Sequence, residues 1–169
     1  MGTRSMIAIQ NPYSKDVRAI YCHWDGYLEH NGAILQKHYS ASPKVNNLIA
    51  LGDLSSLGRE IGEKRPFSKH ELNKEDVDYD AMIARLEEAE KQGWCNFYTR
   101  DRGEDAPFKV FKNLSKASEH YTWSDYYYCF KYSKADDYQS GEWFFKKNGG
   151  RWKKLAPAIA KLNPAECAE

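Results

Sequence analysis

The chain has 169 residues, with 25 Lys and Arg against 24 Asp and Glu, so its formal net charge is +1. This balance excludes the general nucleic-acid binders that hold a phosphate backbone with a strongly basic face, whereas a small anionic ligand needs only a few local cations. The length suits one core, and we expect residues 1–169 to form a single domain.

The N-terminal part of the chain predicts a strand hairpin followed by two helices. Residues 6–10 and 17–24 have the composition of strands. A helix is expected to start near Asn31, and a second at Ser42, where Ser is a good N-cap and the following Pro suits the first helical position. Residues 52–58 predict a compact turn with two leucines that pack under the sheet.

The rest of the chain predicts more strands, with one long helix among them. Residues 60–80 form a polar, charged excursion, and residues 80–92 have apolar side chains at helical spacing. Aromatic and alternating patterns predict strands at residues 95–100, 108–111, 126–132, 142–147 and 151–155. A short helix is expected at residues 157–162. The order predicts an α+β fold, a mainly antiparallel sheet with helices packed on one face.

Two arginines close together follow the predicted strand at 95–100. In an extended conformation Arg100 and Arg102 would project to the same face, and guanidinium groups grip phosphate bidentately. Tyr98 precedes them with an aromatic face, and Asp101 lies between them. The alternative is that the neighbouring acids neutralise both arginines in a solvated network that contributes little. Both interpretations are open at the level of sequence.

A second polar and aromatic cluster follows the strand at 17–24. Trp24 or Tyr27 can stack on a nucleobase, and Asp25 can accept a hydrogen bond from a ribose hydroxyl or an exocyclic amine. His23 belongs to the same run, and Asn31 can help to present backbone donors to an anion at a helix start. The alternative is an Asp-Gly turn with Trp24 in the core. We expect the two clusters to frame one ligand site.

Signatures of catalysis and of metal binding are weak. His23, His30 and His38 match no zinc spacing, and Cys22 beside His23 would point to the opposite face of a strand, so the two form no nucleophile–base pair. The sequence contains neither a nucleophile elbow nor a glycine-rich phosphate loop. We therefore expect binding without catalysis and no cofactor. A small nucleotide-acting enzyme that uses His23 and Asp25 as an acid–base pair is the alternative.

The cysteines and the hydropathy indicate the compartment. Four scattered cysteines show no paired-ligand spacing, which favours free thiols in a reducing cytosol: Cys22, Cys95, Cys129 and Cys167. No apolar run approaches the ~20 residues of a membrane span. The opening residues lack the apolar segment of a signal peptide. We expect a cytoplasmic protein that binds no membrane.

Four segments together resemble small proteins encoded by tailed bacteriophages and prophages: residues 3–9, 21–27, 51–58 and 100–104. The pattern, over roughly the first 105 residues, is also similar to the first type of Thoeris anti-defence protein. Those phage sponges sequester the cyclic ADP-ribose signal of bacterial immunity and, in some members, cyclic oligonucleotides. The resemblance implies a homo-oligomer with pockets between subunits, in which the stretch Arg100–Arg102 holds phosphates. The charged excursion at 60–80 departs from that family.

The expected function is therefore immune evasion by a phage-encoded protein in the cytoplasm of the infected bacterium. It would bind and sequester a small phosphorylated nucleotide signal without turning it over. The alternative is a protein–protein inhibitor of a host defence enzyme, similar to an anti-CRISPR. That inhibitor would use the acidic segment 71–80 or the tyrosine-rich segment 121–138, because tyrosine anchors are typical of interfaces.

Overall fold

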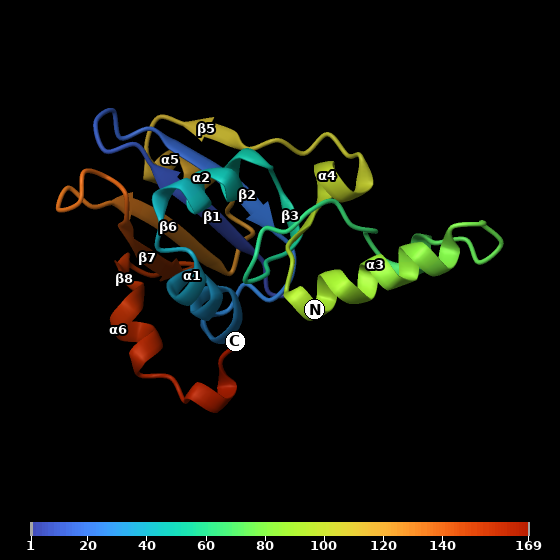
Figure 1. Cartoon of the computed structure of the whole chain (residues 1–169). Coiled ribbons are helices and arrows are strands. Elements are labelled where there is room, and N and C mark those ends of the chain that lie inside the picture. Colours follow the sequence, from blue (N-terminus) through green and yellow to red (C-terminus); the bar gives the residue numbers. More distant parts are fainter. Residues whose placement is uncertain (1, 169) are drawn as a thin grey trace.

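A computed structural model describes residues 2–168, and a mixed eight-stranded sheet forms its centre (Figure 1). The strand order is β4-β3-β2-β1-β6-β7-β8, and β5 pairs with β2. The strands are β1 (Ser5–Gln10), β2 (Val17–Cys22), β3 (Leu54–Ser56), β4 (Asn96–Phe97), β5 (Lys109–Phe111), β6 (Tyr126–Tyr132), β7 (Gly141–Lys147) and β8 (Lys153–Lys154). Among the named strands of the described residues, β1–β6 and β2–β3 pair in parallel and the other pairs are antiparallel. The predicted α+β class with a mainly antiparallel sheet is confirmed.

The part of the chain that the structure describes has six α-helices beside the sheet: α1 (Ala33–His38), α2 (Ser42–Ala50), α3 (Tyr79–Gln92), α4 (Tyr98–Arg102), α5 (Leu114–His120) and α6 (Leu155–Ala160). Short turns of π- and 3-10 helix lie at Leu28–Gly32, Lys69–Glu71 and Pro164–Glu166. Within residues 2–168, no helix is long and apolar enough to cross a membrane.

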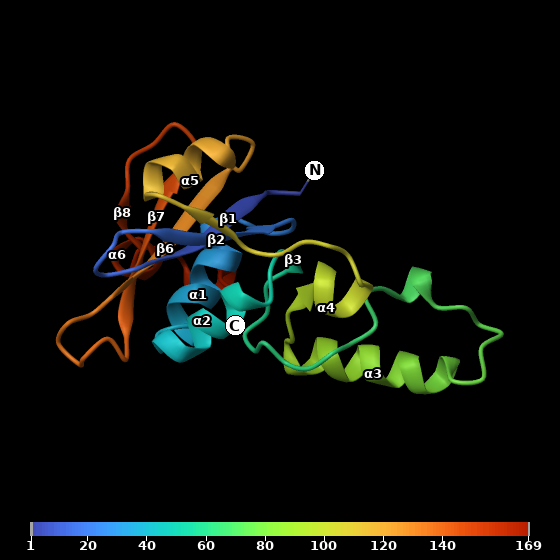
Figure 2. The same cartoon turned by 90° about the horizontal axis from the view of Figure 1, so that it is seen from above.

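The alternation of side chains along β1 produces two cores. Ile7 and Ile9 point to one face, where they pack with apolar residues of α1, α2 and α6. Met6 and Ala8 point to the other face and pack against Ala117 of α5. Most helical cover thus lies on one face, with α5 added on the other, as Figure 2 shows. Both faces of β1 are buried, which explains its nearly continuous apolar sequence.

One part of the chain projects away from the sheet (Figures 1 and 2). We call residues 61–92 the arm, and the sheet with α1, α2, α5 and α6 the body. The outgoing half of the arm is the predicted polar excursion, and the returning half is α3. At its base, Glu60 N–H donates to the Gly93 carbonyl (3.1 Å) and Cys95 N–H donates to the Glu60 carbonyl (2.9 Å). These bonds tie the outgoing and returning segments together.

The predicted strand at 95–100 is wrong over most of its length. Pairing ends at Phe97, and residues 98–102 form helix α4. The Asp101 carboxylate accepts the Phe97 backbone N–H at 2.7 Å, which closes a helical turn across the start of α4. Gly103 ends the helix in the left-handed conformation (φ 73°), which glycine adopts without strain. Arg100 and Arg102 therefore do not share one face of an extended strand.

Candidate functional site

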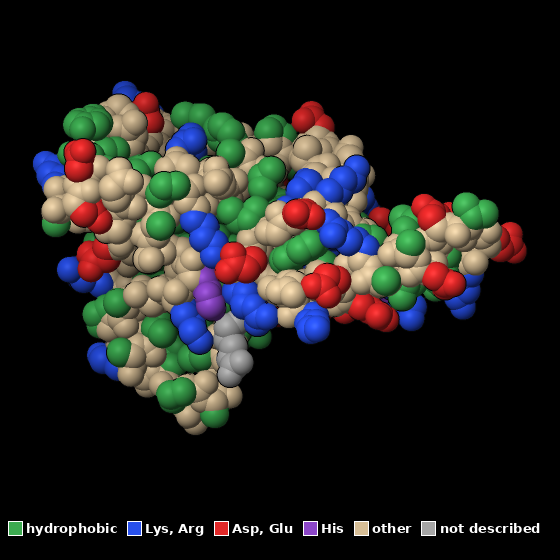
Figure 3. All heavy atoms as spheres, viewed as in Figure 1, with side chains coloured by type: hydrophobic (Ala, Val, Ile, Leu, Met, Phe, Trp, Pro, Cys, Tyr) green, Lys and Arg blue, Asp and Glu red, His purple; other side chains and the backbone are tan. Residues whose placement is uncertain are grey.

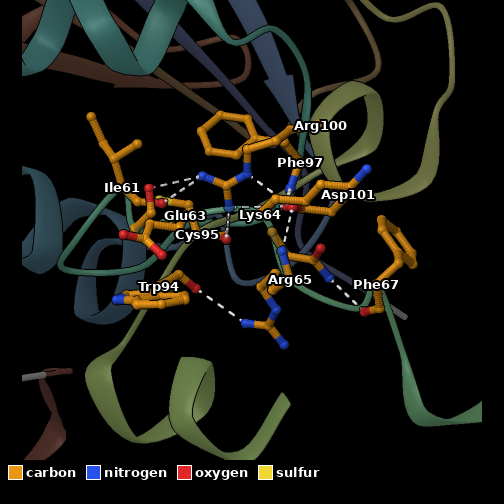
Figure 4. A network of polar contacts seen from close by, with 12 residues as sticks. Ile61, Glu63, Lys64, Arg65, Phe67, Trp94, Cys95, Phe97, Arg100 and Asp101 are labelled. Atoms are coloured by element: carbon orange, nitrogen blue, oxygen red, sulfur yellow. Dashed lines mark hydrogen bonds and ion pairs between the residues drawn. The ribbon is translucent and has the colours of Figure 1, made fainter. Parts of the chain in front are cut away.

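Arg100 and Asp101 form a buried ion pair at the base of the arm (Figure 4). The Arg100 side chain is 13% exposed and that of Asp101 0%, with Nε and Oδ1 2.9 Å apart. The guanidinium also donates to three backbone carbonyls, those of Ile61 (2.9 Å), Gly62 (3.2 Å) and Cys95 (2.9 Å). All three nitrogens of Arg100 thus have acceptors inside the protein, and the pair anchors the outgoing segment of the arm beside β4.

Arg102 lies in a different environment. Its Nε is 3.0 Å from a Glu71 oxygen and 3.4 Å from a Glu104 oxygen, and its side chain is 43% exposed. Its guanidinium lies over the ring of Phe67, 4.6 Å from the ring centroid, and Tyr98 packs on the same ring at 5.5 Å. The structure does not bring the two arginines together around one phosphate. Arg102 instead fits the alternative interpretation of this loop, in which neighbouring acidic side chains neutralise the arginine.

A cleft of about 730 Å³ lies between the body and the arm. Trp24 and Asp25 line it from the turn after β2, and the arm contributes Arg65, residues 67–70 and part of α3. Side chains of both charges are distributed along the arm in Figure 3. Two of the nine predicted ligand residues, Trp24 and Asp25, therefore line this cleft.

Arg65 is the most unusual side chain of this cleft. It is 8% exposed, and within residues 2–168 it pairs with no carboxylate. Its only side-chain hydrogen bonds in that range are long ones, to the carbonyls of Pro66 and Trp94 (both 3.3 Å). In Figure 4 the guanidinium points toward Trp94 and away from the Arg100–Asp101 pair. Burial lowers the pKa of Arg65. The charges of Glu90 and Asp101 act on Arg65 without an ion-pair contact to its guanidinium, and a bound anion in contact would further offset the cost of burying this cation.

Asn96 adds a second unmatched group to the wall of the cleft. Its Nδ2 donates to the Phe67 carbonyl at 2.8 Å, which fixes the orientation of the amide. Its Oδ1 is buried and accepts no hydrogen bond within the described chain. Most buried polar groups in proteins are satisfied, so each exception calls for an explanation. A ligand amino group that reaches this oxygen would satisfy it.

The turn after β2 is rigid enough to hold an aromatic wall. Trp24 is 46% exposed, and its backbone N–H donates to the Ser55 carbonyl at 3.0 Å. Asn31 is fully buried and donates from Nδ2 to the Trp24 carbonyl (3.3 Å) and to Ser5 Oγ (3.2 Å). Asp25 has a left-handed backbone (φ 57°). Asn31 is therefore used to shape the turn, and its side chain is not available to an anion.

The remaining predicted residues lie away from the cleft or at its margin. His23 Nδ1 lies 2.5 Å from Tyr21 Oη, and burial, followed by the charge of Arg4, lowers the pKa of His23. Tyr27 contacts His30, with ring centroids 6.1 Å apart, and of these two only His30 lines the cleft. No group of three or more His, Cys, Asp and Glu side chains among residues 2–168 is placed to hold a metal ion.

Four residues that line the cleft were not predicted from the sequence: Arg65, Lys69 and the two α3 glutamates, Glu87 and Glu90. They lie in segments that we interpreted as solvated or as a plain amphipathic helix. A signal was present, because Arg65 is followed by Pro and Phe67 inside an otherwise polar segment.

No family model, no curated protein and no solved structure matches this chain.

Proposed function

We propose that the protein binds a small phosphorylated nucleotide in the cleft between body and arm and sequesters it without turnover. The observation that carries the proposal is Arg65, a buried guanidinium with no carboxylate partner in the described chain, in the wall of a 730 Å³ hollow. Lys69 adds a second cation on the same segment of the arm. Hydrogen bonds to charged groups contribute roughly 1.5–3 kcal/mol each, so two cations suffice to hold a phosphate.

Other residues of the cleft suit the remaining part of such a ligand. Glu87 and Glu90 of α3 and Asp25 of the body line the cleft as acceptors. A nucleobase and a ribose supply amino and hydroxyl donors for them. Trp24 provides a half-exposed ring, and stacking on an aromatic ring contributes about 1–3 kcal/mol per base. The volume lies within the ~300–1,000 Å³ of small-molecule sites.

Capture without turnover is supported by the state of the cysteines. Cys22, Cys95 and Cys129 are fully buried, and burial raises the pKa of Cys22 and of Cys129 to about 12 and raises that of Cys95 as well. A thiol with such a pKa stays protonated at neutral pH and is a poor nucleophile. None of the three lines the cleft.

The resemblance to phage proteins supplies the biological setting of the proposal. The captured molecule would be a signal of the cyclic ADP-ribose type or a cyclic oligonucleotide, in the cytoplasm of an infected bacterium. The protein would evade immunity by lowering the free concentration of that signal. A homo-oligomer is part of the same proposal, and light scattering after size exclusion measures it directly.

The first test is a thermal-shift and calorimetric screen against ADP-ribose, its cyclic isomers and cyclic di- and trinucleotides. A ligand that binds the native state raises the melting temperature by mass action, and chromatography after heating should return it unchanged. Lys69→Glu should weaken binding at least tenfold, about 1.4 kcal/mol. Lys74→Glu, an exposed lysine outside the cleft, should not. Recovery of a converted product, or equal affinity in both variants, would overturn the proposal.

One observation favours a second candidate, a protein–protein inhibitor. The acidic segment 71–80 lies at the end of the projecting arm, and Val77 there is fully exposed. If no nucleotide shifts the melting temperature, a pull-down with the whole chain should be compared with the Val77→Asp variant. Loss of a captured host protein in that variant would favour the inhibitor.

A further inference from the structure

A second hollow of about 390 Å³ lies beside β2, toward the end of α5, and shares no lining residue with the cleft. Its basic side chains come from three separate elements: Arg4 before β1, Lys109 in β5 and His120 at the end of α5. None of the three is ion-paired within residues 2–168. Arg4 Nε donates to Tyr21 Oη at 3.2 Å, and the two terminal nitrogens of Arg4 have no acceptor in the described chain.

Among residues 2–168, Asp53 is the one carboxylate that lines this hollow. Its Oδ1 accepts the backbone N–H of Tyr21 at 2.8 Å, and Oδ2 accepts no hydrogen bond within the described residues. Burial raises the pKa of Asp53. The neighbouring Tyr121 is 2% exposed, and its hydroxyl is also without a partner among residues 2–168. The hollow thus combines unpaired cations with hydrogen-bonding groups that are not matched inside the protein.

An aromatic surface completes the hollow. Trp123 is 48% exposed and packs edge-to-face on Tyr21, with ring centroids 4.7 Å apart and an interplanar angle of 83°. It also contacts Tyr121 at 5.7 Å. These contacts fix the indole, so that it presents a flat apolar face with little loss of side-chain entropy on binding.

We propose that this hollow binds a hydroxylated phosphate monoester of the size of a pentose phosphate. Arg4 and Lys109 bind the phosphate, Asp53 accepts a sugar hydroxyl, and Trp123 covers the apolar side of the sugar. A phosphate monoester carries about −1.5 to −2 at neutral pH and matches the two cations.

The test uses the full chain and calorimetric titration with ribose 5-phosphate, ribose and inorganic phosphate. We expect ribose 5-phosphate to bind with a Kd below about 1 mM, and each of its two fragments to bind at least tenfold more weakly. Lys109→Glu should weaken binding of ribose 5-phosphate at least tenfold, because it reverses a charge beside the phosphate. Lys112→Glu, at an exposed lysine outside the hollow, should leave it unchanged.

Three results would overturn the proposal. The first is no heat of binding up to about 10 mM ligand. The second is an affinity for ribose 5-phosphate that does not fall in the double variant Arg4→Gln with Lys109→Glu, or that is no higher than the affinity for free glycine. The third is sensitivity to Lys69→Glu, which would place the sugar phosphate in the cleft. Because Lys69 belongs only to the cleft, failure at one site is distinguished from failure at the other.

Discussion

At the scale of single residues, the loss of stability on removing a charged side chain depends on whether its partners are buried inside the protein. Arg100 has an acceptor for every guanidinium nitrogen, and its partner Asp101 is fully buried. Arg100→Ala should therefore destabilise the fold by about 3 kcal/mol, because it leaves a buried carboxylate without its cation. Arg102→Ala removes exposed ion pairs and the contact with the Phe67 ring, and should cost only about 1 kcal/mol. Urea unfolding of both variants measures the difference. Equal losses would contradict a structural role specific to Arg100.

The charge of Asp53 destabilises the fold, whereas that of Arg100 stabilises it. Its folded pKa is raised above the ordinary value of 3.8 by burial, so the folded state holds the proton to higher pH than the unfolded chain. Stability from this group is present below about pH 3.8 and is lost as the pH rises through the folded pKa. Asp53→Asn keeps an oxygen for the Tyr21 N–H and removes the charge.

The Asp53→Asn variant should therefore melt above the wild type at pH 7, and the gap should close as the pH falls below 4. Melting curves of both proteins between pH 3 and 7 measure this. A difference in melting temperature that stays constant with pH, or a variant less stable than the wild type at pH 7, would contradict this. Either result would show that the buried charge of Asp53 does not destabilise the fold. The cost fits a carboxylate kept for a ligand, since binding groups often reduce stability.

At the scale of elements, patterns with a local physical cause predicted the structure well. Apolar residues at helical spacing predicted 80–92, and the structure has α3 at Tyr79–Gln92. The predicted helix at Ser42 is also present. Its expected cap is wrong, however, because Ser42 is the first residue of α2 and its hydroxyl donates to the Tyr138 carbonyl at 2.6 Å. A partner 96 residues away overrode a local preference.

Long-range contacts also explain why one part of the candidate site could be predicted from the sequence and the other part could not. Trp24 and Asp25 follow β2 directly, so a strand followed by a turn was enough to indicate them. Arg65 and Asn96 are far apart in sequence and meet only because the arm folds back on itself. Their proximity depends on the buried Arg100–Asp101 pair, whose helical backbone no strand pattern at 95–100 predicts.

At the scale of the whole molecule, the arm forms one wall of the cleft, yet it has little contact with the body. In α3 only Leu86 and Ala89 are buried, both in its second half. The hydrogen bonds at the base of the arm join Glu60 to Gly93 and Cys95, which follow α3 in the chain, so they do not involve the helix itself. Elements with few buried apolar contacts open at low free energy, so α3 should exchange its amide hydrogens early compared with β6 and β7.

A nucleotide bound in the cleft would contact α3 and the body at once, since Ile83, Leu86 and Glu90 line the cleft together with Trp24. At a ligand concentration of 100 Kd, binding adds about 2.7 kcal/mol to any opening that breaks the site. Amides of α3 that exchange by such openings should then slow about 100-fold. Exchange measured by mass spectrometry with the nucleotide, and in parallel with ribose 5-phosphate, tests this. Protection of α3 by the sugar phosphate, or none by a nucleotide that raises the melting temperature, would place the nucleotide outside the cleft.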